Sequence, residues 1–277
     1  MQAALPHGIP TNVPPKNSPS SDPRHNDQAK NDPPKNDQPK TDPPRNDPRE
    51  KLIVALDVST AAAAQKIVAA VGDSALTYKV GMQLYTAEGP QLVRDLVASG
   101  RRVFLDLKYH DIPNTVAAAV RQAAQLGVSM LTVHATGSAK MLRAAAEAAR
   151  AANPTLIVLA VTVLTSLDEA DLEKVGINGT VVDEVLRLAS LALENGCQGI
   201  VASGHEASAL RKSLGNDFVI VTPGVRPAGA GHADQARVLT PAEAIKAGAS
   251  HIVVGRPITE AADPAAEARS ILRQIGQ

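Results

Sequence analysis

Residues 103–134 read VFLDLKYHDIPNTVAAAVRQAAQLGVSMLTVH, and this stretch contains one complete strand–helix–strand unit. Its two ends, Val103–Leu107 and Met130–His134, are short and mostly apolar, as in strands that are buried on both faces. Between them, Thr115–Leu126 has the length and the alanine-rich amphipathic pattern of a helix, and Gly127 follows where a helix C-cap is expected. The stretch therefore predicts two parallel strands joined by a helix.

The same unit recurs along the chain from Lys51 onward. Eight apolar runs predict strands: Leu52–Leu56, Leu76–Val80, Val103–Leu107, Met130–His134, Leu156–Val161, Gly199–Ala202, Phe218–Val221 and His251–Val254. Eight units of this kind favour closure of the sheet into a single-domain (β/α)8 barrel, the TIM barrel of the α/β class. A doubly wound open sheet is the alternative. Against it, the turn Leu56–Thr60 lacks the Gly-x-Gly-x-x-Gly pattern of a dinucleotide site.

The first fifty residues differ from the rest in composition. They are rich in Pro, Asn, Asp and Lys, and a five-residue unit recurs between Lys30 and Pro48. Such a segment cannot bury a core, so residues 1–50 are predicted to form a disordered tail and residues 51–277 the barrel domain. A dispensable extension is favoured over a tail that docks.

Composition also limits the classes of function. Lys plus Arg and Asp plus Glu both number 28, so no net charge would attract nucleic acid or anionic lipid. The single cysteine, Cys197, cannot form an internal disulfide and has no neighbours with metal-ligand spacing. The chain shows neither a secretory signal nor a run of about eighteen apolar residues. We expect a soluble, cytoplasmic protein that binds neither nucleic acid nor membranes.

Charged residues gather at the predicted strand ends, where the active sites of barrels form. Within Asp106-Leu107-Lys108, strand alternation would place Asp106 and Lys108 on one face. A single buried charge is costly, so these charges must stabilise one another, with Asp111 and Lys79 as further partners. An ordinary buried salt bridge is the alternative. A third charge in the same block favours an active site.

The block Asp106–Thr115, DLKYHDIPNT, resembles the signature of bacterial-type orotidine 5'-phosphate decarboxylases. Other blocks resemble that family in the same order: Ala55–Asp57, Tyr78–Gly81, Val161–Leu167, Val221–Pro227 and Val254–Thr259. The resemblance runs from about Lys51 to the C-terminus. It implies a cofactor-free barrel enzyme, a carboxy-lyase that converts orotidine 5'-phosphate to uridine 5'-phosphate in the last step of de novo UMP synthesis.

The resemblance implies a catalytic array of Lys108, Asp106, Asp111 and Lys79 around the carbon that loses CO2. Lys108 is the expected ammonium that stabilises negative charge at C6 and then donates a proton to it, because such a contact matters most in the transition state. Asp106 is expected near the departing carboxylate. Two roles are open for Asp106, namely destabilising the ground state and positioning Lys108. No cofactor and no metal are expected.

The substrate-binding residues implied by the resemblance are Asp57, Lys79, Asp106, Thr115, Thr165, Arg226, Gln235, Gly255 and Arg256. Asp57 and Lys79 are expected at the ribose hydroxyls. Thr165 is expected at the pyrimidine, with core packing as its alternative. Asp111 and Thr115 are expected to reach the site of the neighbouring subunit, so the resemblance implies a homodimer with shared active sites.

The phosphate end can also be argued from the residues themselves. Gly255 and Arg256 follow the last strand and precede a helix, so backbone N–H groups and a guanidinium converge where barrels commonly hold phosphate. Family analogy adds Arg226 and Gln235. The loop 226–237 is rich in Pro and Gly and is expected to close over the phosphate. Two alanines in it replace the glycine and the first basic residue that family members usually carry.

Two other functions are weighed against the decarboxylase. A metal-dependent 3-hexulose-6-phosphate synthase shares the barrel and an Asp-x-Lys-x-x-Asp spacing, but Lys79 and the blocks 110–115 and 222–227 favour the decarboxylase. A non-catalytic nucleotide-binding barrel would not need four buried charges around an uncharged ring. His134 is either structural or catalytic, and His110 is interpreted as structural.

Overall fold

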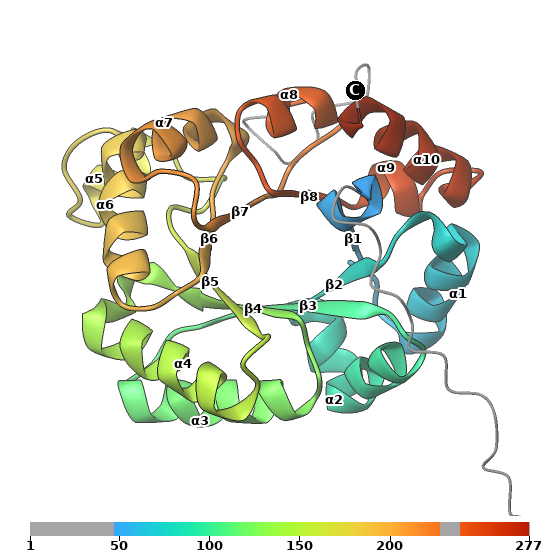
Figure 1. The fold of residues 1–277 in the computed structure, drawn as a ribbon, viewed down its shortest axis with the longest axis horizontal. Helices are drawn as coiled ribbons and strands as arrows, with labels where there is room; N and C mark the ends of the chain where they lie inside the picture. The colour runs from blue at the N-terminus through green and yellow to red at the C-terminus, as the bar shows by residue number, and fades with distance from the viewer. Residues whose placement is uncertain (1–46, 228–238, 277) are drawn as a thin grey trace, which may run out of the picture. The chain divides into compact units, whose positions relative to one another are not determined.

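The structure, a computed structural model, describes residues 47–227 and 239–276. In these residues parallel strands form a closed barrel in chain order, and β8 pairs with β1 to close it (Figure 1). The strands are β1 (Leu52–Ala55), β2 (Thr77–Gly81), β3 (Arg102–Tyr109), β4 (Met130–His134), β5 (Ile157–Val161), β6 (Gly199–Val201), β7 (Val219–Thr222) and β8 (His251–Val254). The predicted (β/α)8 barrel is confirmed.

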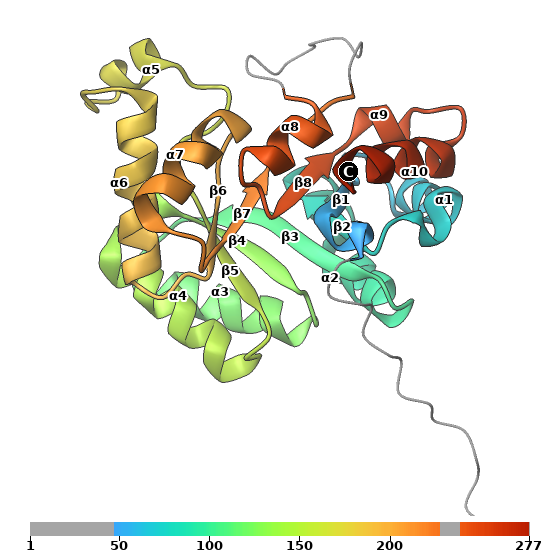
Figure 2. The ribbon, with the colours of Figure 1, turned by 45° about the horizontal axis from the view of Figure 1, so that its top comes forward.

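Helices lie outside the strands in both views of the fold (Figures 1 and 2). They are η1 (Pro48–Lys51), α1 (Ala61–Val71), η2 (Gly72–Ser74), α2 (Met82–Ala98), α3 (Pro113–Gln125), η3 (Ala135–Gly137), α4 (Ser138–Ala152), α5 (Glu169–Lys174), α6 (Val181–Glu194), α7 (Gly204–Leu214), α8 (Pro241–Lys246), α9 (Arg256–Thr259) and α10 (Pro264–Ile275). Within the described ranges, no helix combines the length and the apolar character needed to cross a membrane.

Local sequence explains where several helices begin. At the start of α6, the Thr180 hydroxyl accepts a hydrogen bond from the Asp183 amide at 3.1 Å. The Asp183 carboxylate in turn accepts one from the Thr180 amide at 3.4 Å. The helix α8 begins in the same way, with Thr240 and Glu243 as the reciprocal pair. Each such cap satisfies amides that the helix cannot pair and contributes about 1 kcal/mol.

The strands are buried on both faces, which explains their nearly continuous apolar sequences. One cluster of side chains fills the barrel interior: Ile53, Ala55, Phe104, Met130, Leu159, Val221 and Val253. Their neighbours along the strands belong to a larger cluster that also includes the inner faces of the helices. Alternation then predicts that Asp106, two residues beyond Phe104, lies on the interior face near the carboxyl end of β3.

The structure describes a few residues before the predicted domain boundary at Lys51. Asp47 starts η1, because its carboxylate accepts a hydrogen bond from the Arg49 amide at 2.9 Å. Glu50 pairs with Arg102 on β3. Composition alone placed the boundary, and it could not show that Arg49 contacts the Asp73 carbonyl oxygen or that Glu50 pairs with Arg102. A disordered tail over the remaining residues stays a prediction, since residues 1–46 lie outside the described ranges.

The buried His251 of β8 should make the free energy of unfolding depend on pH. Its Nδ1 lies 2.8 Å from the Glu50 carbonyl oxygen. Burial lowers the pKa of His251 below its ordinary value of 6.5, partly offset by that hydrogen bond. The unfolded chain therefore takes up a proton below about pH 6.5 that the folded protein does not bind, so the free energy of unfolding should fall as the pH drops from about 7 towards 5.

Replacing His251 with asparagine should make that fall shallower, because asparagine keeps an N–H donor and does not titrate. Urea unfolding at about pH 7.5 and pH 5.5 measures the difference. His205→Asn is the matched control, since His205 is an exposed histidine on α7. Equal pH dependence in the wild type and the His251 variant would contradict the prediction.

Candidate active site

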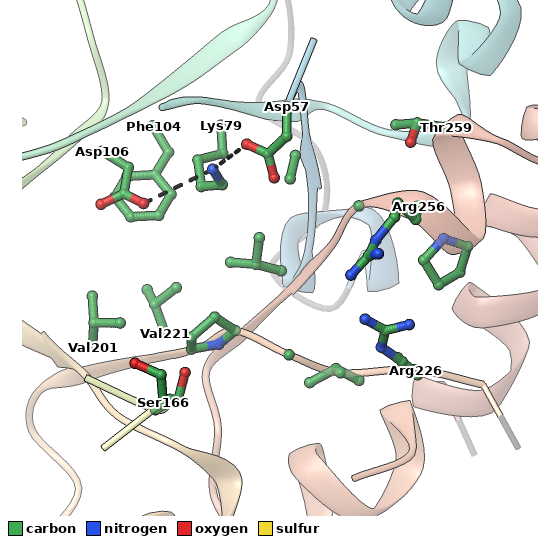
Figure 3. A pocket seen from close by; sticks show the side chains of 18 of the residues that line it. Asp57, Lys79, Phe104, Asp106, Ser166, Val201, Val221, Arg226, Arg256 and Thr259 are labelled. Atoms are coloured by element: carbon green, nitrogen blue, oxygen red, sulfur yellow. Dashed lines mark hydrogen bonds and ion pairs between the residues drawn. The ribbon is translucent and has the colours of Figure 1, made fainter. Parts of the chain in front are cut away.

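A pocket of about 600 Å³ opens at the carboxyl ends of the strands. Its floor is apolar (Figure 3). It includes Phe104 and Val221 of the interior cluster, and Val201, which packs against that cluster. The charged side chains that line it are Asp57, Lys79, Asp106, Lys108, Arg226, Arg256 and Glu260. This is the face of the barrel on which the sequence analysis expected an active site.

Lysines and aspartates alternate along one side of this pocket. Lys79 Nζ lies 2.8 Å from Asp57 Oδ1 and 3.9 Å from Asp106 Oδ2 (Figure 3). Lys108 Nζ lies 2.9 Å from Asp106 Oδ1. The side chains of Lys79, Asp106 and Lys108 are 12%, 15% and 26% exposed, whereas that of Asp57 is 60% exposed. The array thus runs from solvent into the barrel, with every charge next to an opposite one.

The strand register explains why these groups meet. Ala55 of β1 pairs with Lys79 of β2, and Gly81 of β2 pairs with Asp106 of β3. Asp57, two residues beyond Ala55, therefore lies near the level of Gly81 and Asp106. Because parallel strands point their carboxyl ends to one side of the sheet, their last inward side chains converge there.

Lys108 reaches the pocket by a route that simple strand alternation does not describe. Its φ is 51°, in the left-handed region that residues with a side chain rarely adopt. The pairing of β3 with β4 also shifts between Leu105 and Tyr109. The regular strand assumed for Asp106-Leu107-Lys108 was therefore wrong, although the two charged side chains do meet.

Two guanidinium groups line the opposite side of the pocket. Arg226 follows β7, and Arg256 is the first residue of α9; Figure 3 shows their head groups directed toward the same region, away from Asp106. Gly255 precedes Arg256, and a Cβ built on it would be in ordinary van der Waals contact with that of Ala55, at 3.5 Å. The pocket is thus polarised, with paired charges at one side and a pair of arginines at the other.

The comparisons with known proteins agree with this geometry. The model of the "Orotidine 5'-phosphate decarboxylase / HUMPS family" matches residues 50–271. The chain belongs to this family. Orotidine 5'-phosphate decarboxylase of Moorella thermoacetica is 53% identical over 233 residues, which cover 82% of this chain and 92% of the relative.

Two further relatives extend the comparison. Orotidine 5'-phosphate decarboxylase of Anaeromyxobacter dehalogenans is 55% identical over 222 residues, covering 80% of this chain and 96% of the relative. The crystal structure of orotidine 5'-phosphate decarboxylase from Lactobacillus acidophilus superposes with a TM-score of 0.75 at 37% identity, covering 82% of this chain and all of that one. The family resemblance inferred from the motifs is confirmed.

Some of the residues that the family resemblance predicted lie away from the pocket. Asp111 and Thr115 are exposed, and the Asp111 carboxylate accepts a hydrogen bond from the Ile112 amide at 2.6 Å. The next residue, Ile112, is a large apolar side chain that is 67% exposed. Gln235 lies outside the described residues. Positions on the surface of one subunit are where residues that serve a neighbouring subunit would lie, so the shared site stays a prediction.

The pocket also contains residues that the sequence analysis did not single out. Thr165 lines it as predicted, and its neighbour Ser166 does so too (Figure 3). Thr259 and Glu260 line it near Arg256. Ser166 belongs to the family block 161–167, so the motif itself contained the signal. Thr259 likewise belongs to the family block 254–259, whereas Glu260 lies just beyond it, after the short helix α9.

Two histidines, His110 and His134, lie together near Lys108. The rings of His110 and His134 stack with centroids 5.4 Å apart, and His134 Nδ1 lies 2.9 Å from the Thr136 hydroxyl. Burial lowers the pKa of His134, and the nearby His110 and Lys108 lower it further. Among the described residues, no group of three or more His, Cys, Asp or Glu side chains is placed to hold a metal ion.

Proposed function

We propose that this protein decarboxylates orotidine 5'-phosphate to uridine 5'-phosphate without a cofactor, as the last step of de novo UMP synthesis. One observation carries the proposal: the pocket has interleaved lysines and aspartates at one side and two arginines at the other. A nucleotide that reacts at its base and carries a phosphate at its far end has the matching polarity. The family and the names of its relatives support the same reaction.

Lys108 is the group that acts on the reacting carbon. When the bond between C6 and the carboxylate breaks, the electron pair stays on C6 and CO2 leaves. The Lys108 ammonium stabilises this charge and then transfers a proton to C6, which leaves a neutral amine that regains a proton from water. The charge at C6 exists only late in the reaction, so a cation there lowers the barrier more than it improves substrate binding.

Asp106 holds that ammonium in place, and Lys79 helps to balance the charge of Asp106. Asp106 lies between the two lysines, at 2.9 Å from Lys108 and 3.9 Å from Lys79. In the proposed complex Asp106 is close to the departing carboxylate. Asp57 and Lys79 contact the ribose hydroxyls, which suits the exposed position of Asp57 at the pocket rim. Thr165 contacts the pyrimidine from the opposite wall.

The arginine side of the pocket binds the phosphate. Arg226 and Arg256 supply guanidinium groups, which pair with phosphate oxygens through two parallel hydrogen bonds each. Gly255 lines the pocket next to Arg256, and its backbone contributes to the phosphate site. Gln235, which lies outside the described residues, is proposed as a further phosphate ligand by family analogy.

A single assay tests the function. Purified protein should convert orotidine 5'-phosphate to uridine 5'-phosphate in the presence of EDTA, which is followed by the change in ultraviolet absorbance and by identification of the product. Turnover that EDTA abolishes would favour the metal-dependent synthase chemistry. Tight binding of the nucleotide without turnover would instead favour a binding protein.

The proposed enzyme is a cytoplasmic homodimer with shared active sites. Asp111 and Thr115 are exposed at the end of β3 and the start of α3, beside the exposed apolar side chain of Ile112. In the dimer these two residues enter the pocket of the other subunit, where Asp111 joins the Lys108 array.

Mixing two inactive variants tests the shared site. Lys108→Ala and Asp111→Ala should each lose activity, whereas refolding them together should restore about a quarter of the wild-type rate. Half of the randomly mixed dimers contain one subunit of each kind. In such a dimer one of the two sites combines an intact Lys108 with an intact Asp111 from the other subunit. No recovery on mixing would mean that each site uses its own Asp111.

A further inference from the structure

Thr132 of β4 contacts both members of the Asp106–Lys108 pair, yet it does not line the pocket. It is fully buried and lies two residues beyond Met130, whose side chain is in the barrel interior. Its hydroxyl oxygen accepts a hydrogen bond from the Lys108 amide at 2.9 Å. The same hydroxyl donates its hydrogen to Asp106 Oδ1 at 3.0 Å. One buried hydroxyl thus connects the backbone of Lys108 to the carboxylate that its ammonium contacts.

The contact falls where the backbone of β3 is irregular. Leu105 pairs with Leu131 and Tyr109 with Val133, so β3 has more residues than β4 between these two pairs. Such a bulge takes residues out of the regular ladder and leaves backbone groups that need other partners. Lys108 lies in this bulge with a φ of 51°, a conformation that surrounding contacts must maintain. The Thr132 hydroxyl supplies one of those contacts.

Thr132 also determines the orientation of the Asp106 carboxylate. Oδ1 receives the Thr132 hydroxyl at 3.0 Å and the Lys108 ammonium at 2.9 Å. Oδ2 is then directed toward Lys79, whose Nζ lies 3.9 Å away. Rotation of the carboxylate would break the contact with Thr132, so the hydroxyl favours the orientation in which each oxygen is directed toward a different lysine.

We propose that Thr132 is a positioning residue for the decarboxylation: its hydroxyl holds the Lys108 backbone and the Asp106 carboxylate in one arrangement, so that the ammonium is in place when the substrate binds. The inference rests on the proposed function. It assigns no contact between Thr132 and the substrate. Its effect should therefore fall on the chemical step, because small displacements of a reacting group cost more in rate than in affinity.

Two variants of Thr132 isolate the effect of its hydroxyl. Thr132→Val removes it and keeps the branched shape, while Thr132→Ser keeps it and removes the methyl group. We expect kcat to fall about tenfold to a hundredfold in the valine variant, with KM changed by less than about threefold. The serine variant should stay within about threefold of the wild type. Should the valine variant not fold, Thr132→Ala against Thr132→Ser gives the same comparison.

Thr77→Val is the control variant. It shows whether valine at any buried threonine lowers kcat. Thr77 is 3% exposed at the start of β2, at the other end of the barrel, and does not line the pocket. This variant should keep the wild-type kcat. A valine variant at position 132 with unchanged kcat would overturn the proposal. So would a serine variant as slow as the variant that lacks the hydroxyl, because the methyl group would then be what matters.

Amide hydrogen exchange at Lys108 separates this inference from the proposed function. The Lys108 amide should exchange slowly in the wild type and in Thr132→Ser, and at least about tenfold faster in the variants without the hydroxyl. This readout needs no substrate. If the protein failed to turn over orotidine 5'-phosphate but the exchange result held, the proposed function would be wrong and the structural role of Thr132 would stand. Equal exchange in all variants would refute that role whatever the activity.

Discussion

Replacing Lys108 with alanine should abolish turnover of orotidine 5'-phosphate while leaving the barrel folded. The variant removes both the cation that stabilises the charge at C6 and the donor of the proton. Losses of this kind cost on the order of a ten-thousandfold or more in kcat. The effect should appear in kcat and not only in KM, because the variant leaves the proposed phosphate contacts of Arg226 and Arg256 in place.

The fold should survive because Asp106 keeps other partners. The Thr132 hydroxyl lies 3.0 Å from one of its oxygens and Lys79 lies 3.9 Å from the other, so the carboxylate is not left as an isolated buried charge. Thermal unfolding checks this point. Lys212→Ala is the matched control, since Lys212 is an exposed lysine of α7 outside the pocket. A Lys108 variant with a kcat near the wild-type value would contradict the assignment of Lys108 as the proton donor.

The architecture could be predicted because its signal is local. Runs such as Leu52–Ala55 and Ile252–Val254 are apolar at every position, which strands in a covered parallel sheet require and amphipathic helices do not. Their closure into a barrel followed from counting eight such units. The helix starts were equally local, since Thr180 and Thr240 cap their helices through residues only three positions away.

The candidate site was predicted only as far as its residues lie in recognisable blocks. The motif identified Asp106 and Lys108, but not the bulge through which they meet, because the register of β3 on β4 depends on contacts between distant segments. The role of Thr132 was not predicted for the same reason. Nothing in the strand sequence MLTVH distinguishes a hydroxyl that supports an active site from one that packs in the core. Glu50 could not be assigned a structural role either, because its partners Arg102 and His251 come from strands distant in the sequence.

Replacing Arg256 with alanine should lower kcat/KM for orotidine 5'-phosphate by at least about a hundredfold, roughly 3 kcal/mol. Arg256 lies across the pocket from Asp106, so in the proposed complex it does not contact the carbon that loses CO2 (Figure 3). In the proposed complex its contact with the phosphate provides binding energy that helps to assemble the charged site. Loss of the guanidinium should therefore cost more than ground-state affinity.

The nucleoside orotidine, which lacks the phosphate, distinguishes this role from a structural one. The wild type and Arg256→Ala should decarboxylate it at nearly the same low rate, because orotidine never makes the contact that the variant lacks. Arg269→Ala is the matched control, since Arg269 is an exposed arginine on α10 outside the pocket. If Arg256→Ala slowed orotidine as much as the phosphorylated substrate, Arg256 would support the fold or the pyrimidine end of the pocket, and its assignment to the phosphate would be wrong.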